Sequence, residues 1–189
     1  MTTQTRTPIQ TESLAGTRWA IDPAHTSVEF AVKHMKIATV KGRFAELTAT
    51  LAVEADDLAT ATVVVDIDAA SLDTRSEQRD EHLRSADFFD VANHPRLTFR
   101  SRSVTARGDG EYRIVGDLTI RGVTRELVLD AEFQGSGQDP WGGTRLGFTA
   151  AGRVDRRDLG LTWNAAIEAG GFLVGDEVRL AIDAQFVRQ

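Results

Sequence analysis

The chain has 189 residues, 41% of them hydrophobic and 26% charged, with a net charge of −6, and this length fits one globular domain. The negative net charge disfavours nucleic-acid binding and does not indicate a polybasic patch for an anionic lipid surface. The chain has no cysteine, which excludes disulfides, thiolate catalysis and thiolate metal ligands.

The N-terminal stretch MTTQTRTPIQTESLAG lacks the apolar segment of a signal peptide. We therefore predict a disordered tail over residues 1–16, a single barrel domain over residues 17–189 and a cytoplasmic location. No later segment approaches the roughly 20 apolar residues that a membrane-spanning helix needs, so stable membrane insertion is not expected.

Alternation of apolar and polar residues, the pattern of a half-buried strand, runs through most of the chain. The segments that show it are 18–22, 27–34, 39–53, 60–68, 97–103, 112–121, 127–133, 145–154 and 178–186. The phase changes between Phe44 and Leu47, which predicts a β-bulge there. Short turns join most of these segments, so we predict an antiparallel meander whose apolar face closes into a barrel or folds into a sandwich.

A polar segment at 74–95 interrupts the strand pattern. The sequence TRSE at 74–77 matches a capping box, in which Thr74 would cap a helix that runs to about Arg84. Asp80 has the spacing for an ion pair with Arg84, and Phe88 and Phe89 would anchor the segment. We predict a short helical connector near residues 75–90 that covers one end of the barrel and has no catalytic role.

The residues give no catalytic or metal-binding motif. The four histidines, at positions 25, 34, 82 and 94, show no HExxH or comparable ligand spacing. Asp80 and His82 lie in one run of helical residues, where neighbouring side chains diverge by roughly 100°. We assign no catalytic residue, no metal ligand and no cofactor. A metal site built from distant histidines stays open, as does a small barrel enzyme that uses His25, His34, His82 or Asp80 within one cleft.

The interior of the barrel allows two interpretations. Eight strands enclose a space that side chains can fill or that can hold one small ligand. The apolar face mixes phenylalanines with glycine, alanine and serine, which fits both an interdigitated core and an elongated cavity. A packed core would favour a third function, that of a protein-interaction module.

Six motifs follow one another over residues 17–187: WAIDPAHTSVEF at 19–30, VKGRF at 40–44, RDEHL at 79–83, DFFDV at 87–91, GDLTIRGV at 116–123 and VGDEV at 174–178. Together they resemble the YceI-like family of polyisoprenoid-binding proteins. The resemblance implies an all-β, lipocalin-like, eight-stranded antiparallel barrel. It also implies that a long isoprenoid or similar amphiphile fills the lumen and that the charged segment is a structural connector.

On this resemblance the function is non-enzymatic binding or carriage of a polyisoprenoid, an isoprenoid quinone or a fatty acid or amide. The candidate ligand-binding residues are Phe30, Val32, His34, Phe44, Val63, Val65, Phe99, Leu118, Ile120, Leu129, Phe148, Ala150, Trp163 and Phe172. His34 ends the lumen face of its strand and is the candidate for a head-group contact, although a neutral core histidine fits that position equally well. The expected partner is this hydrophobic ligand, and a homodimer stays open.

Overall fold

The computed structural model describes residues 13–168 and 170–189. The strands are β1 (Thr17–Ile21), β2 (Ser27–His34), β3 (Ala38–Phe44), β4 (Leu47–Val53), β5 (Ala61–Asp68), β6 (Leu72–Asp73), β7 (Arg96–Gly108), β8 (Glu111–Ile120), β9 (Val123–Gln138), β10 (Thr144–Asp155) and β11 (Val174–Arg188). The helices are α1 (Glu77–Arg84) and four short 3-10 turns, η1 (Pro23–His25), η2 (Leu58–Thr60), η3 (Ala69–Ser71) and η4 (Arg156–Leu159). None of these described helices is long and apolar enough to cross a bilayer.

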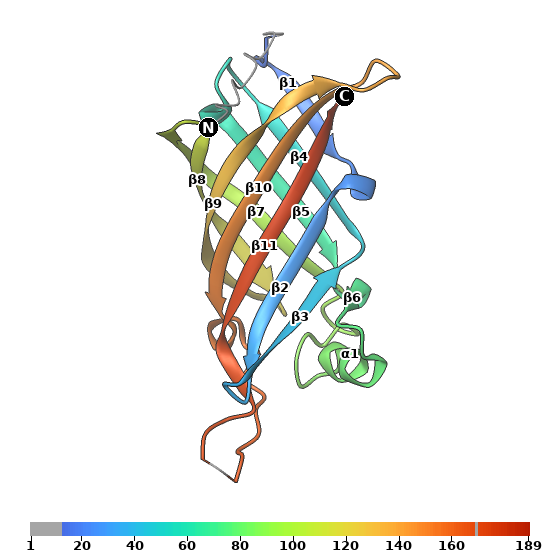
Figure 1. Cartoon of the computed structure of the whole chain (residues 1–189), viewed down its shortest axis with the longest axis vertical. Helices are drawn as coiled ribbons and strands as arrows, with labels where there is room; N and C mark the ends of the chain where they lie inside the picture. The colour runs from blue at the N-terminus through green and yellow to red at the C-terminus, as the bar shows by residue number, and fades with distance from the viewer. Residues whose placement is uncertain (1–12, 169) are drawn as a thin grey trace, which may run out of the picture.

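Eight strands form a closed ring in the order β1-β4-β5-β7-β8-β9-β10-β11, and β11 pairs with β1 to complete it. The sheet continues from β11 through β2, β3 and β6. Figure 1 shows the strands inclined around an elongated body. We call the end that carries β1 the upper end and the end that carries the β2–β3 turn the lower end. The predicted all-β, eight-stranded antiparallel barrel is confirmed.

The prediction of a β-bulge between Phe44 and Leu47 is wrong, because the chain changes partners there. β3 pairs with β2 and β6, whereas β4 pairs with β1 and β5. Between them the amide of Ala45 donates to the Ser71 carbonyl (3.1 Å) and the amide of Glu46 donates to the Ser71 hydroxyl (3.0 Å). The contact that divides the strand thus comes from a residue far along the sequence.

A bulge does occur in β7, where the register against β8 shifts between Ser101 and Ser103. The Ser101 hydroxyl accepts a hydrogen bond from the amide of Val63 (2.8 Å). Beyond the bulge Val104 lines the interior, whereas Ser103 is exposed. Unbroken alternation over the predicted segment 97–103 would place Ser103 on the inner face with Ser101, and that expectation is wrong.

The helical connector is present as α1, but its first turn differs from the predicted capping box. The N-cap is Ser76, whose side chain makes no capping hydrogen bond. Thr74 instead donates to the buried carboxylate of Asp80 through its hydroxyl (2.5 Å) and its amide (3.0 Å). Arg84 donates to the Ala70 and Leu72 carbonyls rather than to Asp80. Both the predicted cap and the predicted ion pair are wrong, because Asp80 points toward the chain that precedes the helix.

The predicted N-terminal tail falls largely on residues 1–12, which lie outside the described residues. Its last residues contact the loop that follows β4. The Ser13 hydroxyl and the amides of Leu14 and Ala15 all donate to Asp56 Oδ1, over 2.7, 2.6 and 3.1 Å. Residues 13–16 therefore have a defined position at the upper end.

Candidate functional site

The lumen contains an elongated cavity of about 260 Å³ whose surface is contributed by apolar atoms. Its lining extends from Leu58 and Phe186 toward the upper end to Leu159 and Val174 at the lower end. Two buried clusters supply these walls, one around Trp19 and one around Phe99. Because apolar side chains occupy both clusters, the cavity suits a ligand that is itself apolar along most of its length.

Two glycines let the tips of aromatic rings approach the barrel wall closely. Gly42 on β3 pairs with Phe30, and a Cβ added there would lie 2.3 Å from the Phe30 ring. At Gly116 on β8 an added Cβ would lie 2.5 Å from the Phe99 ring. Without a Cβ at either glycine the two rings occupy space at the wall rather than in the centre of the lumen.

Small side chains face each other in the middle of the lumen. Ala131 on β9 pairs with Ala150 on β10, and both line the cavity. The adjacent Thr149 points outward, where its hydroxyl accepts a hydrogen bond from the side-chain amide of Gln134 (3.1 Å). Alternation along β10 thus places neighbouring residues on opposite sides of one wall.

Eleven of the fourteen candidate residues line this one cavity. They are Phe30, Val32, Phe44, Val63, Val65, Phe99, Leu118, Ile120, Leu129, Phe148 and Ala150. The period-two pattern selected them, and the closed sheet brings them together from seven strands. Contact of these residues with a ligand stays a prediction.

The other three candidates, His34, Trp163 and Phe172, do not line this cavity. Val32 is the last residue of β2 in the lining, and His34 follows at the end of the strand, where it pairs with the cavity residue Val174. The Trp163 ring packs edge-on against His82, with ring centroids 4.7 Å apart, on the side of α1. Phe172 is 63% exposed. Trp163 and Phe172 lie outside the long strands, where no alternation indicates which way a side chain points.

Arg156 is a cavity residue that the sequence did not reveal, and it is only 3% exposed. Its guanidinium donates to the carbonyls of Gly175 (2.8 Å), Leu161 (2.5 Å) and Trp163 (2.9 Å). Two longer contacts, of 3.4 Å each, reach the Val174 carbonyl and Asp176. Burial lowers the pKa of this guanidinium by removing it from water. Arg156 therefore fastens η4, the segment after it and the start of β11 into one lower-end closure.

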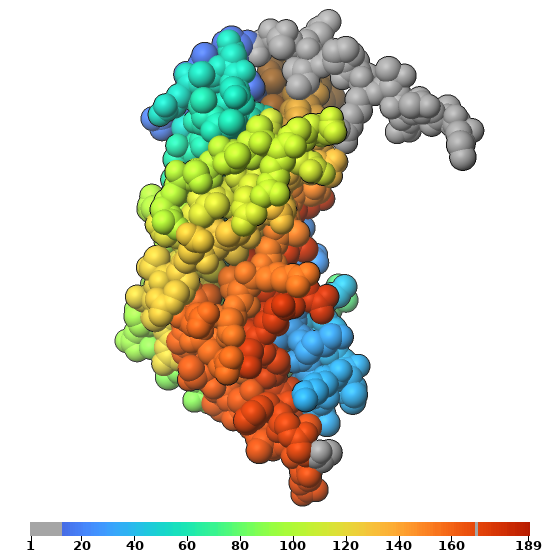
Figure 2. Space-filling model, turned by 90° about the vertical axis from the view of Figure 1, so that its left-hand side faces the viewer, coloured from blue at the N-terminus to red at the C-terminus, as the bar shows by residue number. Residues whose placement is uncertain are grey.

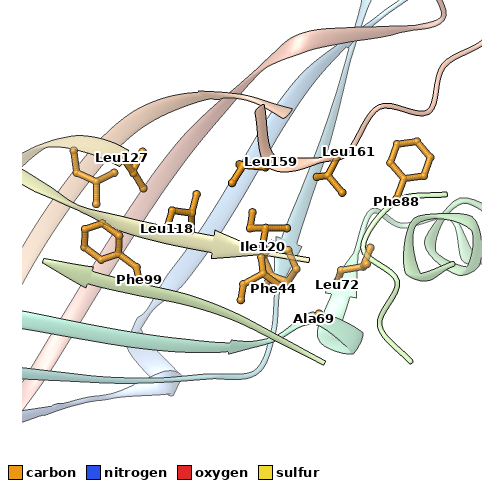
Figure 3. Packing of buried hydrophobic residues seen from close by; sticks show 12 residues of the cluster. Phe44, Ala69, Leu72, Phe88, Phe99, Leu118, Ile120, Leu127, Leu159 and Leu161 are labelled. Carbon is orange, nitrogen blue, oxygen red and sulfur yellow. The ribbon is translucent and has the colours of Figure 1, made fainter. Parts of the chain in front are cut away.

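The connector completes the lower-end closure. Leu83 of α1 and the following Phe88 and Phe89 line the cavity together with Leu159 and Leu161. Figure 3 shows Phe88 approaching from the side of the helix while Leu159 and Leu161 lie over the barrel interior. The predicted position of the connector, over one end of the barrel, agrees with this arrangement.

Packing and an ionic cluster hold the segments together at the upper end. Trp19 is 1% exposed, and its indole N–H donates to the Thr17 hydroxyl (2.9 Å). Outside this packing, Arg145 of β10 donates to Asp22 and, over 2.8 Å, to Asp139. Hydrogen bonds from His25 and Arg145 lower the pKa of Asp22 to about 2. The ion pairs tie β10 to the turn that follows β1.

The residues of the enzyme alternative do not converge on the cavity. None of His25, His34, His82 and Asp80 belongs to its lining. His25 pairs with Asp22 near the upper end, His82 pairs with Asp87 beside α1, and Asp80 is held by Thr74. Within residues 13–168 and 170–189, no group of three or more metal-ligating side chains is close enough to hold an ion. The described geometry offers no acid/base pair that faces the lumen.

Comparison with known proteins gives consistent matches over the barrel. A model of the YceI-like domain matches residues 19–186. A UPF0312 protein of Staphylococcus aureus is 36% identical over 171 residues, which are 90% of this chain and 97% of the relative. The solved YceI protein of Campylobacter jejuni superposes with a TM-score of 0.72 at 29% identity, over 83% of this chain and 90% of that one. A polyisoprenoid binding domain from Saccharophagus degradans shares the fold, with a TM-score of 0.67 at 14% identity, over 90% of this chain and 98% of that domain.

Proposed function

This chain belongs to the YceI-like family, and we propose that it is a binding protein that holds a long-chain amphiphile inside its barrel. The class of ligand is a polyisoprenoid, an isoprenoid quinone or a fatty acid or amide. The observation that carries the proposal is the apolar cavity inside the lumen of the barrel. The description of the Saccharophagus domain as polyisoprenoid binding supports this ligand class.

The apolar lining and the small volume of the cavity indicate how such a ligand is recognised. Burial of each methylene contributes about 0.8 kcal/mol, so affinity rises with the length of chain inside the lumen. The cavity volume of about 260 Å³ lies just below the roughly 300–1,000 Å³ of ordinary ligand pockets. A narrow, apolar site of this kind selects a ligand by the width and length of its chain and discriminates weakly between head groups.

The ionisable residues that line the cavity, Arg156 and Tyr112, fit a binding site without a catalytic group. Arg156 directs its N–H groups to backbone carbonyls, and burial raises the pKa of Tyr112. Neither arrangement supplies a proton donor or acceptor poised near neutral pH. The cytoplasmic location and the homodimer stay predictions.

The test compares phenylalanine at two neighbouring positions of β10. Ala150→Phe places a ring in the lumen, where it should occupy ligand space and reduce the amount or the length of bound lipid. Thr149→Phe places the same ring on the outer face and should leave the ligand unchanged. Mass spectrometry of lipid extracted from the purified proteins measures both effects, and thermal melts of the delipidated proteins report their intrinsic stability.

Two results would contradict the proposal. Equal lipid content in the two variants would show that no ligand passes Ala150. Absence of lipid from the unaltered protein, together with much earlier melting of Ala150→Phe, would show a packed core, because overpacking typically costs about 1–3 kcal/mol.

A further inference from the structure

Large apolar side chains are exposed at the lower end, next to the closure by Arg156. Ile37 is 83% exposed, Phe172 63% and Met35 38%. The amide of Met35 donates to the Leu173 carbonyl (2.8 Å), so the β2–β3 turn and the segment that carries Phe172 lie side by side. Figure 2 shows the body narrowing toward this end, where the blue hairpin adjoins the red segment. We call the four residues Met35, Lys36, Ile37 and Phe172 the tip.

The turn of the tip has an unfavourable backbone conformation for its sequence. Met35 and Lys36 both have positive φ, of 51° and 62°, as in a type I′ turn. Such turns favour Asn-Gly or Asp-Gly because side chains with a Cβ are strained in this region. The β8–β9 turn of the same protein uses Arg121-Gly122, with glycine at one of its two positive-φ positions. The turn therefore holds two residues in a disfavoured conformation and presents both side chains to solvent.

Positive charge surrounds the tip. The three lysines of the chain are Lys33 on β2, Lys36 in the turn and Lys41 on β3. Residues 30–45 contain no aspartate or glutamate, although the net charge of the whole chain is −6. Glu168 is the one charged residue between positions 164 and 174. Asp176 and Glu177 follow on β11 beside Lys33, but both pair with arginines. The lysines therefore give the surroundings of the tip a local positive charge that the net charge of the chain does not reveal.

We propose that the tip docks on the surface of an anionic lipid bilayer. Exposed apolar side chains flanked by lysines match a bilayer interface, where the former enter the acyl boundary and the latter meet the head groups. Val174 lines the cavity and pairs with His34, directly beside the turn, so docking would bring the lower end of the lumen to the membrane. This inference goes beyond the proposed function, since it concerns the outer surface and does not depend on what the cavity holds.

The upper end supplies a matched control. Trp141 is 87% exposed in the β9–β10 loop, and its amide donates to Asp139 (3.0 Å). No lysine lies in this loop. Trp141 thus tests whether any exposed large side chain suffices for docking.

The experiment is sedimentation of the full chain with vesicles of phosphatidylcholine alone or mixed with phosphatidylglycerol. The unaltered protein should bind the mixed vesicles more strongly, and added salt should reduce the difference. Ile37→Ser and Phe172→Ser should each weaken binding to the mixed vesicles about tenfold. Lys36→Gln should weaken it about fivefold and lower its salt dependence. Trp141→Ser should bind like the unaltered protein.

Three results would overturn the proposal: no sedimentation of the unaltered protein with mixed vesicles, equal loss of binding in Trp141→Ser and Ile37→Ser, or conversion of a dimer to a monomer by Ile37→Ser in the absence of vesicles. The last result would assign the tip to a second copy of the chain. Mass spectrometry measures the lipid bound inside each variant, independently of the sedimentation with vesicles. Loss of docking can therefore be distinguished from loss of ligand binding.

Discussion

One arginine fastens each end of the barrel, but the two arginines have different partners. At the upper end Arg145 meets the carboxylates of Asp22 and Asp139, and its side chain is 23% exposed. At the lower end Arg156 meets mainly backbone carbonyls, and its side chain is 4% exposed. The first arrangement balances charge between partly exposed side chains, whereas the second supplies hydrogen-bond donors from a buried guanidinium to backbone carbonyls, of which that of Leu161 belongs to a buried residue.

This difference decides what each arginine contributes to stability. Water still reaches the carboxylates of Asp22 and Asp139, whose side chains are 16% and 12% exposed, so it can partly solvate either one when Arg145 is lost. A buried carbonyl that loses its donor keeps its full desolvation penalty, of about 1–3 kcal/mol. The lower end therefore depends on one side chain far more than the upper end does.

The largest predicted effect is that of Arg156→Met. The variant leaves the carbonyls of Gly175, Leu161 and Trp163 without donors, and we expect the free energy of unfolding to fall by about 3–5 kcal/mol. Urea denaturation measures the loss. Arg145→Met is the matched control at the upper end and should lose less.

Arg156→Lys keeps the charge but lacks the planar fork that reaches several carbonyls at once. We expect its stability to lie between those of the unaltered protein and Arg156→Met. Equal losses in Arg156→Met and Arg145→Met would contradict the comparison between the two ends.

A second prediction concerns the buried polar groups beside α1. The Thr74 hydroxyl donates to Asp80 and accepts from Arg79 Nε (2.7 Å). Thr74→Val keeps the shape but removes both side-chain bonds, and it should cost about 1.5–3 kcal/mol because the carboxyl group of Asp80 is buried and loses a hydrogen-bond donor. Ser76→Ala is the control, since the Ser76 side chain makes no capping bond, and it should change stability by less than about 0.5 kcal/mol. A larger loss in Ser76→Ala than in Thr74→Val, measured by urea denaturation, would show instead that Ser76 caps the helix and that the Thr74 hydroxyl is dispensable.

The sequence predicted those features that depend on local periodicity. Alternation identified the inner residues of each long strand, such as Val63 and Val65 on β5, because side chains in a strand alternate with a period of two. The sequence pattern did not predict features that depend on contacts between residues far apart in the chain. The break after Phe44 rests on Ser71, and Arg156 lies among charged neighbours that resemble an ordinary solvated turn.

The errors at the candidate site have the same cause, because local periodicity does not show where the lumen and the surface of the folded chain lie. His34 continues the inner alternation of β2, but Val32 is the last residue of this strand that lines the cavity. The tip escaped detection because an overall charge of −6 says nothing about where three lysines gather. Placement of side chains beyond the strand ends requires the tertiary structure.

The smallest predicted effect separates the two ends by their response to acid. Asp22 has a pKa of about 2 in the folded protein, below the value of about 3.9 in an unfolded chain. Its contribution to stability is therefore complete above about pH 4 and is lost as the pH falls toward about 2. Asp22→Asn cannot titrate, so its free energy of unfolding should be slightly lower than that of the unaltered protein at pH 6, and the two should converge toward pH 2.

Most of the deficit of Arg156→Met should instead persist over this range, because the backbone carbonyls that Arg156 serves do not titrate and its contact with the Asp176 carboxylate is long, at 3.4 Å. Urea denaturation at successive pH values measures all three proteins. The free energies of unfolding of Asp22→Asn and the unaltered protein are compared as functions of pH. A difference that stays constant down to pH 2 would show that the charge of the Asp22 carboxylate contributes nothing to stability. Convergence of Arg156→Met with the unaltered protein would show that the lower end, too, is held by a titrating group, and the contrast between the two arginines would then fail.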